Sequence, residues 1–79
     1  MNDLKVVKTL DCSGTLCPIP IVKTKKAITE IEVGEILEMI STDSGAMPDM
    51  EAWARQTQHE LLESHDEGET FRFLIRKTH

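Results

Sequence analysis

The residues Cys17, Pro18, Ile19 and Pro20 constrain the fold of this chain more than any other stretch. Two prolines in four residues exclude a central β-strand, because neither ring nitrogen can donate a hydrogen bond to a neighbouring strand. Prolines do fit the start of a helix, where the first N–H groups have no intrahelical acceptor and φ is already near the helical value. The sequence therefore predicts a helix that begins at Pro18, with Cys17 at its N-cap.

A cysteine at a helix N-cap indicates a nucleophile. The positive end of the helix dipole favours the thiolate, which is the reactive form of the side chain. The usual N-cap residues are Ser, Thr, Asp and Asn, so a Cys there needs another reason. A cysteine can also serve simply as a small buried apolar residue, and that alternative stays open. We take Cys17 as the candidate catalytic residue and Gly14, Pro18 and Pro20 as residues that position it.

The size and composition predict a single small globular domain spanning residues 1–79. The chain has 79 residues, of which 39% are hydrophobic and 29% charged, and no apolar segment is long enough to span a bilayer. We therefore expect no membrane partner. Its first residues lack a basic segment followed by an apolar run, so we also expect a cytoplasmic location.

The charge and the cysteine content exclude several classes of function. A net charge of −5 argues against direct binding of nucleic acid, so protein partners are expected. The two cysteines and three histidines show no zinc-ligand spacing, and we expect neither a metal nor a cofactor. A disulfide between Cys12 and Cys17 would close a very short loop, and a redox switch made by this pair remains an alternative.

Periodicity predicts the element order β-α-β-α-β-β. We expect strands at 5–11, 35–42, 61–66 and 70–77, and helices at 18–32 and 46–59. Apolar residues at helical spacing predict the buried faces of the helices, which are Ile21, Thr24, Ala27, Ile28 and Ile31 in the first and Met50, Trp53, Ala54 and Thr57 in the second. The fold class is α/β (α+β), a two-layer sandwich with a four-stranded mixed sheet and two helices on one face.

Three lysines lie near the middle of the first predicted helix. Lys23, Lys25 and Lys26 are candidate contacts for an acidic partner, and a solvated helix face explains them equally well.

The chain resembles the TusA/SirA-like family of sulfur carriers over nearly its whole length. The resemblance rests on the Cys-Pro-x-Pro signature after the first predicted strand, together with several shorter matches along the chain. The matching residues are Leu10, Asp11, Gly14, Cys17, Pro18, Pro20, Thr24, Lys25, Lys26, Ala27, Thr42, Asp43, Asp49, Trp53, Ala54, Arg55, His59, Glu60, Leu61, Ile75, Arg76 and Lys77. The sequence departs from the family pattern at Ser44, where members often have Pro, and near Glu51, where a second Pro is common and this chain has Pro48 instead. It also departs at Gln58, where many members have Gly.

The resemblance implies that Cys17 carries sulfane sulfur as a persulfide in a sulfur relay. The donor would be a cysteine desulfurase or a rhodanese, and an acceptor protein would take the sulfur on toward tRNA thiolation, cofactor synthesis or sulfur oxidation. Such a protein is a carrier of the sulfurtransferase type, not a stand-alone enzyme. The alternatives are a regulatory or adaptor domain, in which Cys17 only caps a helix, and the Cys12/Cys17 redox switch.

Overall fold

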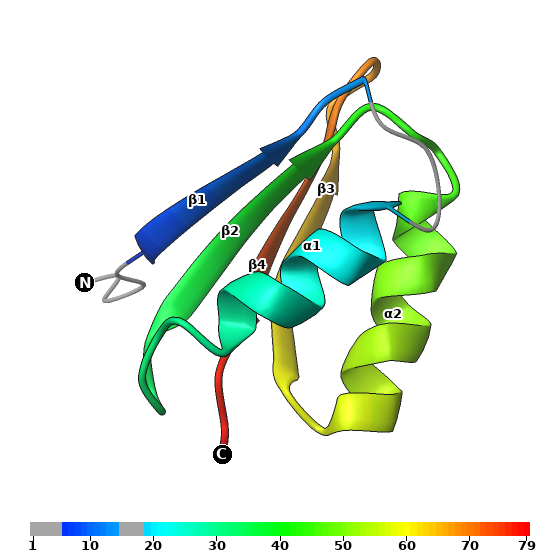
Figure 1. Ribbon diagram of the computed structural model, residues 1–79. Helices are drawn as coiled ribbons and strands as arrows, with labels where there is room; N and C mark the ends of the chain where they lie inside the picture. The colour runs from blue at the N-terminus through cyan, green and yellow to red at the C-terminus, as the bar shows by residue number, and fades with distance from the viewer. Residues whose placement is uncertain (1–5, 15–18) are drawn as a thin grey trace, which may run out of the picture.

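The computed structural model describes residues 6–14 and 19–79, and its sheet has the strand order β1-β2-β4-β3. The elements are β1 (Val6–Cys12), α1 (Ile19–Ile28), β2 (Ile36–Ser41), α2 (Ala46–Thr57), β3 (Glu60–Asp66) and β4 (Phe71–Arg76). β1 and β2 are parallel, whereas the β2–β4 and β4–β3 pairs are antiparallel. Both helices cover the same face of the sheet (Figure 1). The predicted element order, the mixed sheet and the two-layer arrangement are confirmed.

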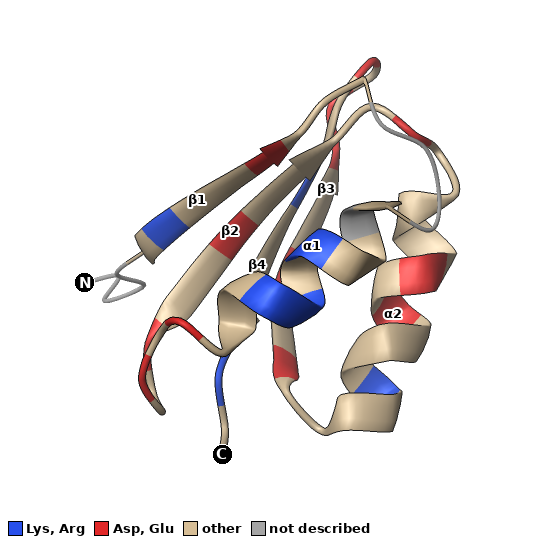
Figure 2. Cartoon of the chain, viewed as in Figure 1, with Lys and Arg blue, Asp and Glu red and all other residues tan. Residues whose placement is uncertain are grey.

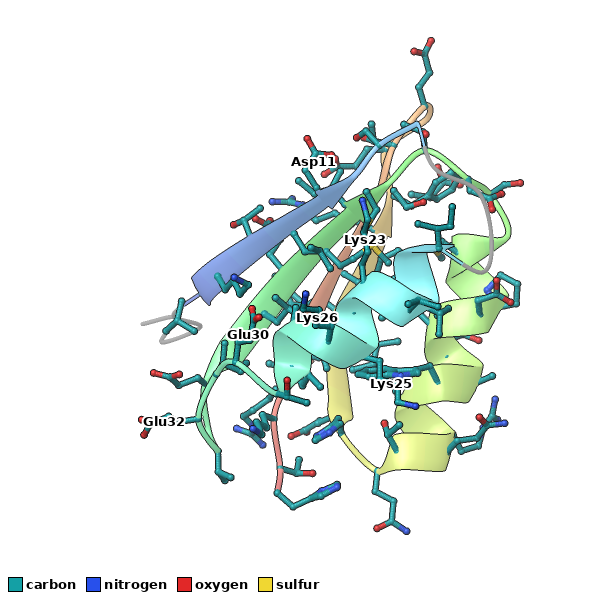
Figure 3. The ribbon with its side chains drawn as sticks, in the orientation of Figure 1. Asp11, Lys23, Lys25, Lys26, Glu30 and Glu32 are labelled. Atoms are coloured by element: carbon teal, nitrogen blue, oxygen red, sulfur yellow. The ribbon has the colours of Figure 1, made fainter. Side chains whose placement is uncertain are left out.

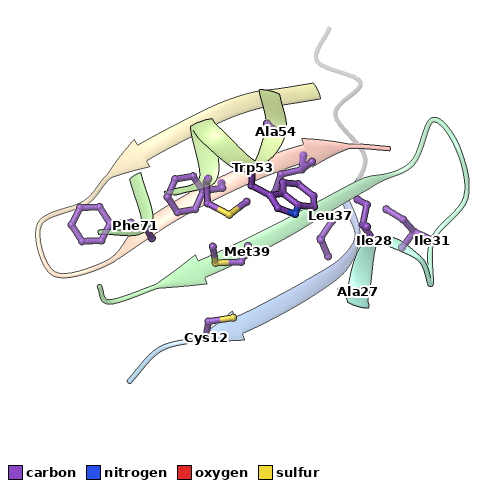
Figure 4. Packing of buried hydrophobic residues seen from close by; sticks show 13 residues of the cluster. Cys12, Ala27, Ile28, Ile31, Leu37, Met39, Trp53, Ala54 and Phe71 are labelled. Atoms are coloured by element: carbon purple, nitrogen blue, oxygen red, sulfur yellow. The ribbon is translucent and has the colours of Figure 1, made fainter. Parts of the chain in front are cut away.

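The hydrophobic core lies between the helices and the two central strands (Figure 4). Leu37 and Met39 of β2 and Phe73 of β4 are completely buried. Met39 lies opposite Phe73 in the antiparallel register, so these side chains point to the same face of the sheet. Alternation along each strand therefore produces the apolar face on which the helices pack.

On the face predicted to be buried in α2, Met50, Trp53 and Ala54 are all less than 10% exposed, while Thr57 is only partly buried. The helix ends at Thr57, two residues earlier than predicted. Gln58 has φ of 67°, in the left-handed region, and its N–H donates to the carbonyl of Ala54 at 2.8 Å. This left-handed residue stops the helix and turns the chain into β3.

The prediction that the first helix continues to residue 32 was wrong, because α1 ends at Ile28. The carbonyl of Lys26 accepts hydrogen bonds from both the hydroxyl (2.6 Å) and the N–H (3.2 Å) of Thr29. The N–H of Glu30 then bonds to Ala27, three residues back, at 2.9 Å. Thr29 thus ends the α-helix, because hydrogen bonds to residues three positions back take the place of the α-helical bonds to residues four positions back. Ile31 still reaches the core through these turns and is 6% exposed.

Most described strand ends differ from the prediction by one residue, whereas the predicted end of β3 at Asp66 is confirmed. Cys12, which we assigned to a loop, is the last residue of β1 because it pairs with Ser41 of β2. Strand β3 begins at Glu60, while β2 and β4 are each shorter by one residue at either end. The start predicted for the first strand, residue 5, lies outside the described residues.

The face of the sheet away from the helices combines charged residues with the apolar residues Ile36, Ile40 and Leu74. Glu38 of β2 accepts a hydrogen bond from the Thr9 hydroxyl at 3.1 Å and pairs with Arg72 of β4 at 3.3 Å. Arg72 also pairs with Glu67 at 3.0 Å, and Arg76 pairs with Glu60. Within the described residues, no helix is long and apolar enough to cross a membrane.

Candidate functional site

The candidate site lies at the edge of the sheet where β1 and β2 end. Because these strands are parallel, their carboxyl ends meet at one edge, and the loops leading to α1 and α2 leave from it (Figure 1). The N–H of Gly14, after β1, donates to the hydroxyl of Thr42, after β2, at 2.8 Å. This bond ties together the described parts of the two loops.

A tight turn follows β1 at this edge. The carboxylate of Asp11 accepts a hydrogen bond from the N–H of Ser13 at 2.9 Å, which is a typical Asx turn. Hydrogen bonds from Ser13, with a smaller contribution from the charge of Lys23, lower the pKa of Asp11. Gly14 has φ of 81°, a conformation that glycine adopts without strain. The turn therefore carries a fixed negative charge and needs a glycine, while the role of Gly14 in positioning Cys17 stays a prediction.

The loop after β2 is held by its own side chains. The N–H of Asp43 donates to the hydroxyl of the buried Ser41 at 3.0 Å, and the Asp43 carboxylate accepts from the N–H of Gly45 at 3.0 Å. The carbonyl of Asp43 also accepts from the N–H of Ala46, at 2.9 Å, where α2 begins. These bonds fix the start of α2 and hold Thr42 next to Gly14.

The predicted nucleophile is not among the described residues. Cys17 and Pro18 lie outside them, so the N-cap position of Cys17 stays a prediction. Ile19, two residues after Cys17 in the sequence, is the first residue assigned to α1, and Pro20 follows it in the first helical turn. A proline at this position is compatible with the helix, since its missing N–H would have had no intrahelical partner.

The second cysteine is part of the core. Cys12 is completely buried, and its side chain lies on the same face of the sheet as Met39 (Figure 4). Burial is the main effect on its thiol and raises its pKa, while the charges of Lys23 and Asp11 act in opposite directions. Cys12 therefore has the environment of a structural residue and is shielded from large reagents.

The three predicted partner contacts point in two directions (Figure 3). Lys23 and Lys26 lie beside β1, where they line a groove of about 210 Å³ with Lys8, Leu10, Ala27 and Glu30. We call this feature the basic groove. Lys25 is exposed but does not line it. Lys8 pairs with Glu30 at 3.2 Å.

Sequence reasoning did not include Lys8 in the site, and it named Thr42 only among the residues that match the family. Lys8 alternates with Leu10 and Cys12, so period two places it on the helix side of β1. Thr42 directly follows a strand that is parallel to β1. Period two alone could have placed Lys8, whereas the closeness of Thr42 to Gly14 depends on the parallel pairing of β1 with β2. In the described part of the chain, no three His, Cys, Asp or Glu side chains come together as a possible metal site.

Comparison with known proteins gives consistent results. The family model described as sulfurtransferase TusA matches residues 8–77. The protein YrkI of Bacillus subtilis is 50% identical over 74 residues, covering 94% of this chain and 99% of YrkI. Sulfur carrier protein TusA of Allochromatium vinosum is 46% identical over 69 residues, covering 87% of this chain and 91% of that protein.

A solved structure supports the fold. The SirA-like protein of Desulfitobacterium hafniense has a TM-score of 0.79 and 21% sequence identity, covering 92% of this chain and all of that one. The match of the family model over nearly the whole chain, together with these relatives, shows that this chain belongs to the TusA family.

Proposed function

We propose that this protein is a sulfur carrier that holds sulfane sulfur as a persulfide on Cys17. The observation that carries the proposal is the family match over residues 8–77, which includes Cys17 and the two prolines that follow it, Pro18 and Pro20. The arrangement of the described residues supports it. The Gly14–Thr42 bond holds Gly14, three residues before Cys17, against the second loop, and α1 begins within the signature, at Ile19.

The proposed transfer needs two exchange steps. The Cys17 thiolate attacks the terminal sulfur of a donor persulfide; a new S–S bond forms on Cys17, and the donor cysteine leaves as its thiolate. The acceptor thiolate then attacks the terminal sulfur on Cys17, and the Cys17 thiolate leaves. Each step exchanges one S–S bond for another, so no external oxidant or reductant is consumed. A cysteine desulfurase or a rhodanese would be the donor.

Burial of Cys12 favours the carrier over the redox switch. A Cys12/Cys17 switch would require a completely buried thiol at the end of β1 to be reached by an oxidant or a partner. A carrier needs only Cys17.

Intact mass spectrometry tests the proposal. The protein is incubated with a cysteine desulfurase, pyridoxal phosphate and cysteine, and its mass is measured before and after treatment with a reductant. We expect a gain of about one sulfur atom that the reductant removes. Cys12→Ser should keep this gain, whereas Cys17→Ser, which retains a capping oxygen, should abolish it. An adaptor role would be favoured if the wild type never gained sulfur from donors of either class, and a gain that depended on Cys12 would favour the switch.

A further inference from the structure

We propose that the basic groove and the free edge of β1 bind an extended acidic segment of a partner protein, which adds to the sheet as a further strand. The proposal goes beyond the sulfur chemistry, because it needs neither Cys17 nor a persulfide. It names a docking surface in addition to the transfer site.

The first observation is the position of β1 in the sheet. β1 is an end strand in the order β1-β2-β4-β3, and among the described residues it pairs only with β2. Its outer edge therefore presents backbone N–H and C=O groups that a second strand can pair with. Val6 and Val7, at the start of the strand, are 37% and 43% exposed. An added strand would cover apolar surface as well as pair with backbone groups.

The second observation is the charge beside this edge. Lys8, Lys23 and Lys26 line the groove with a single glutamate, Glu30, in a protein whose net charge is −5. Lys8 is paired with Glu30, whereas none of the ion pairs within the described ranges includes Lys23 or Lys26. Two cationic side chains thus stand beside an unpaired strand edge. Their positive charges repel a basic segment and attract an acidic one.

The third observation is the shape of the groove. Two residues contribute the apolar surface of the groove between α1 and β1. Leu10 is partly buried, and Ala27 is almost fully buried. Because side chains alternate along a strand, every second residue of an added strand would face α1 and its lysines. The pattern that fits is therefore an extended segment with an acidic residue at every second position.

The other edge of the sheet does not fit the same segment. β3 carries Glu60, Glu63 and Asp66, and the turn after it carries Glu67 and Glu69 (Figure 2). These charges repel an acidic strand, and a register irregularity between Leu61 and Glu63 interrupts the regular edge. The net charge of −5 also disfavours a second copy of this chain as the occupant of the groove.

The test uses a labelled peptide of about eight residues in which glutamate and valine alternate, long enough to span β1. Binding is measured by fluorescence anisotropy with the wild type and with Cys17→Ser, so that a failure of the sulfur chemistry does not affect the result. The control peptide replaces valine with proline, which keeps the charge but fixes φ at about −65° at every second residue and so favours a polyproline II helix over a β-strand. We expect binding of the valine peptide to both proteins, and weak or no binding of the proline peptide.

Matched variants locate the site. Lys23→Glu and Lys26→Glu should each weaken binding at least about fivefold, whereas Lys25→Glu, with the same charge change on the same helix, should weaken it less than about twofold. All three side chains are exposed, so the fold should be retained. Glu30→Gln should strengthen binding, because it removes the carboxylate that lines the groove and frees Lys8. Amide hydrogen exchange should slow in β1 and not in β3.

Several results would overturn the proposal. Equal binding of the proline peptide would exclude strand addition, and an equal effect of Lys25→Glu would show that charge alone attracts the peptide. Protection of β3, or no binding at about 1 mM peptide, would also overturn it. Concentration-dependent dimerisation of the wild type that Lys23→Glu abolishes would identify a second copy as the occupant instead.

Discussion

Burial distinguishes the two cysteines of this chain at the level of single residues. Cys12 is completely buried at the end of β1, and burial raises its pKa, so both access and thiolate content are reduced. Cys17 is predicted to lie at a helix N-cap, where the dipole favours the thiolate. Pro18 and Pro20, which follow Cys17, lack N–H groups that would solvate its thiolate. We therefore expect the pKa of Cys17 to fall only modestly below that of an ordinary cysteine.

We predict that limiting iodoacetamide at neutral pH labels Cys17 before Cys12 in the folded protein. Peptide mapping after short exposure measures the ratio of the two products, and labelling in denaturant provides the reference in which both thiols are accessible. A faster reaction at Cys12 in the folded protein would remove the basis for placing the sulfur on Cys17.

Trp53 is the largest side chain in the core and contacts more than the sheet. It is 7% exposed, and its ring stacks on His59 with centroids 5.7 Å apart. Its indole nitrogen is buried without a hydrogen-bond partner among the described residues, so its contribution to stability comes from packing.

We therefore predict that Trp53→Ala lowers the free energy of unfolding by about 3–5 kcal/mol, a large fraction of the total for so small a domain. Trp53→Phe keeps an aromatic ring and loses only the unpartnered N–H and part of the volume, so it should cost about 1–2 kcal/mol. Urea unfolding followed by circular dichroism gives both values. Equal costs for the two variants would show that the packing argument is wrong.

At the level of elements, α2 ends at a residue whose conformation suits glycine better. Gln58 has φ of 67°, and its N–H and C=O are both used, by Ala54 and by the Thr78 hydroxyl respectively. The resemblance to the family already indicated a glycine at this position. Gln58→Gly should raise the free energy of unfolding by about 0.5–1 kcal/mol, since it removes left-handed strain and keeps both backbone bonds. The matched control is Gln56→Gly, inside the helix, which should lower it by a similar amount. A loss of stability in Gln58→Gly would contradict this account of the helix end.

The junction between α2, β3 and the C-terminal residues contains a stacked pair of imidazoles. His59 and His79 have ring centroids 4.4 Å apart, and the N–H of Thr78 donates to Nδ1 of His59 at 3.2 Å. Burial, followed by the charges of His79 and Lys77, lowers the pKa of His59. The folded state therefore favours the neutral ring, and the unfolded chain takes up a proton more readily.

It follows that stability should fall as the pH drops below about 6.5, the ordinary pKa of histidine, toward the lower folded value. The stabilising contribution is fully present above that pH, because His59 is then neutral in both states. Urea midpoints measured between pH 7.5 and 5 should decline in the wild type and decline less in His59→Gln, which cannot be protonated. An identical decline in the two proteins would assign the effect to other groups.

The element order and most of the core were predictable from the sequence because period-two and helical spacings record which side chains face inward. The ends of α1 and β1 were not, since they depend on a competing Thr29 hydroxyl and on the pairing of Cys12 with Ser41. The candidate site was also only partly predictable from the sequence. Gly14 and the lysines stand out in the sequence, but the grouping of Lys8 with Lys23 and Lys26, without Lys25, depends on α1 packing beside the edge strand.

For the whole molecule, the charges are distributed unevenly. The lysines of the basic groove lie on one side, and carboxylates dominate β3 and its following turn on the other (Figure 2). An even surplus of negative charge would repel an acidic partner equally at both edges of the sheet. In the docking that we propose, this distribution would favour the approach of an acidic segment to β1 over β3.

The same distribution predicts that the protein alone does not bind tRNA appreciably, even if the sulfur it carries is destined for tRNA. The affinity of proteins for nucleic acid grows with the number of phosphates that Lys and Arg neutralise, and strong binders make about 6–10 such contacts. The basic groove offers three lysines, one of them already paired with Glu30, and the rest of the surface contributes to a net charge of −5. The aromatic side chains Trp53, Phe71 and Phe73 are buried and cannot stack on bases.

A filter-binding titration of bulk tRNA at physiological salt should give a Kd well above about 1 µM, and Lys23→Glu should change it little. Submicromolar binding that weakens steeply with added salt would show that a basic surface beyond the groove exists.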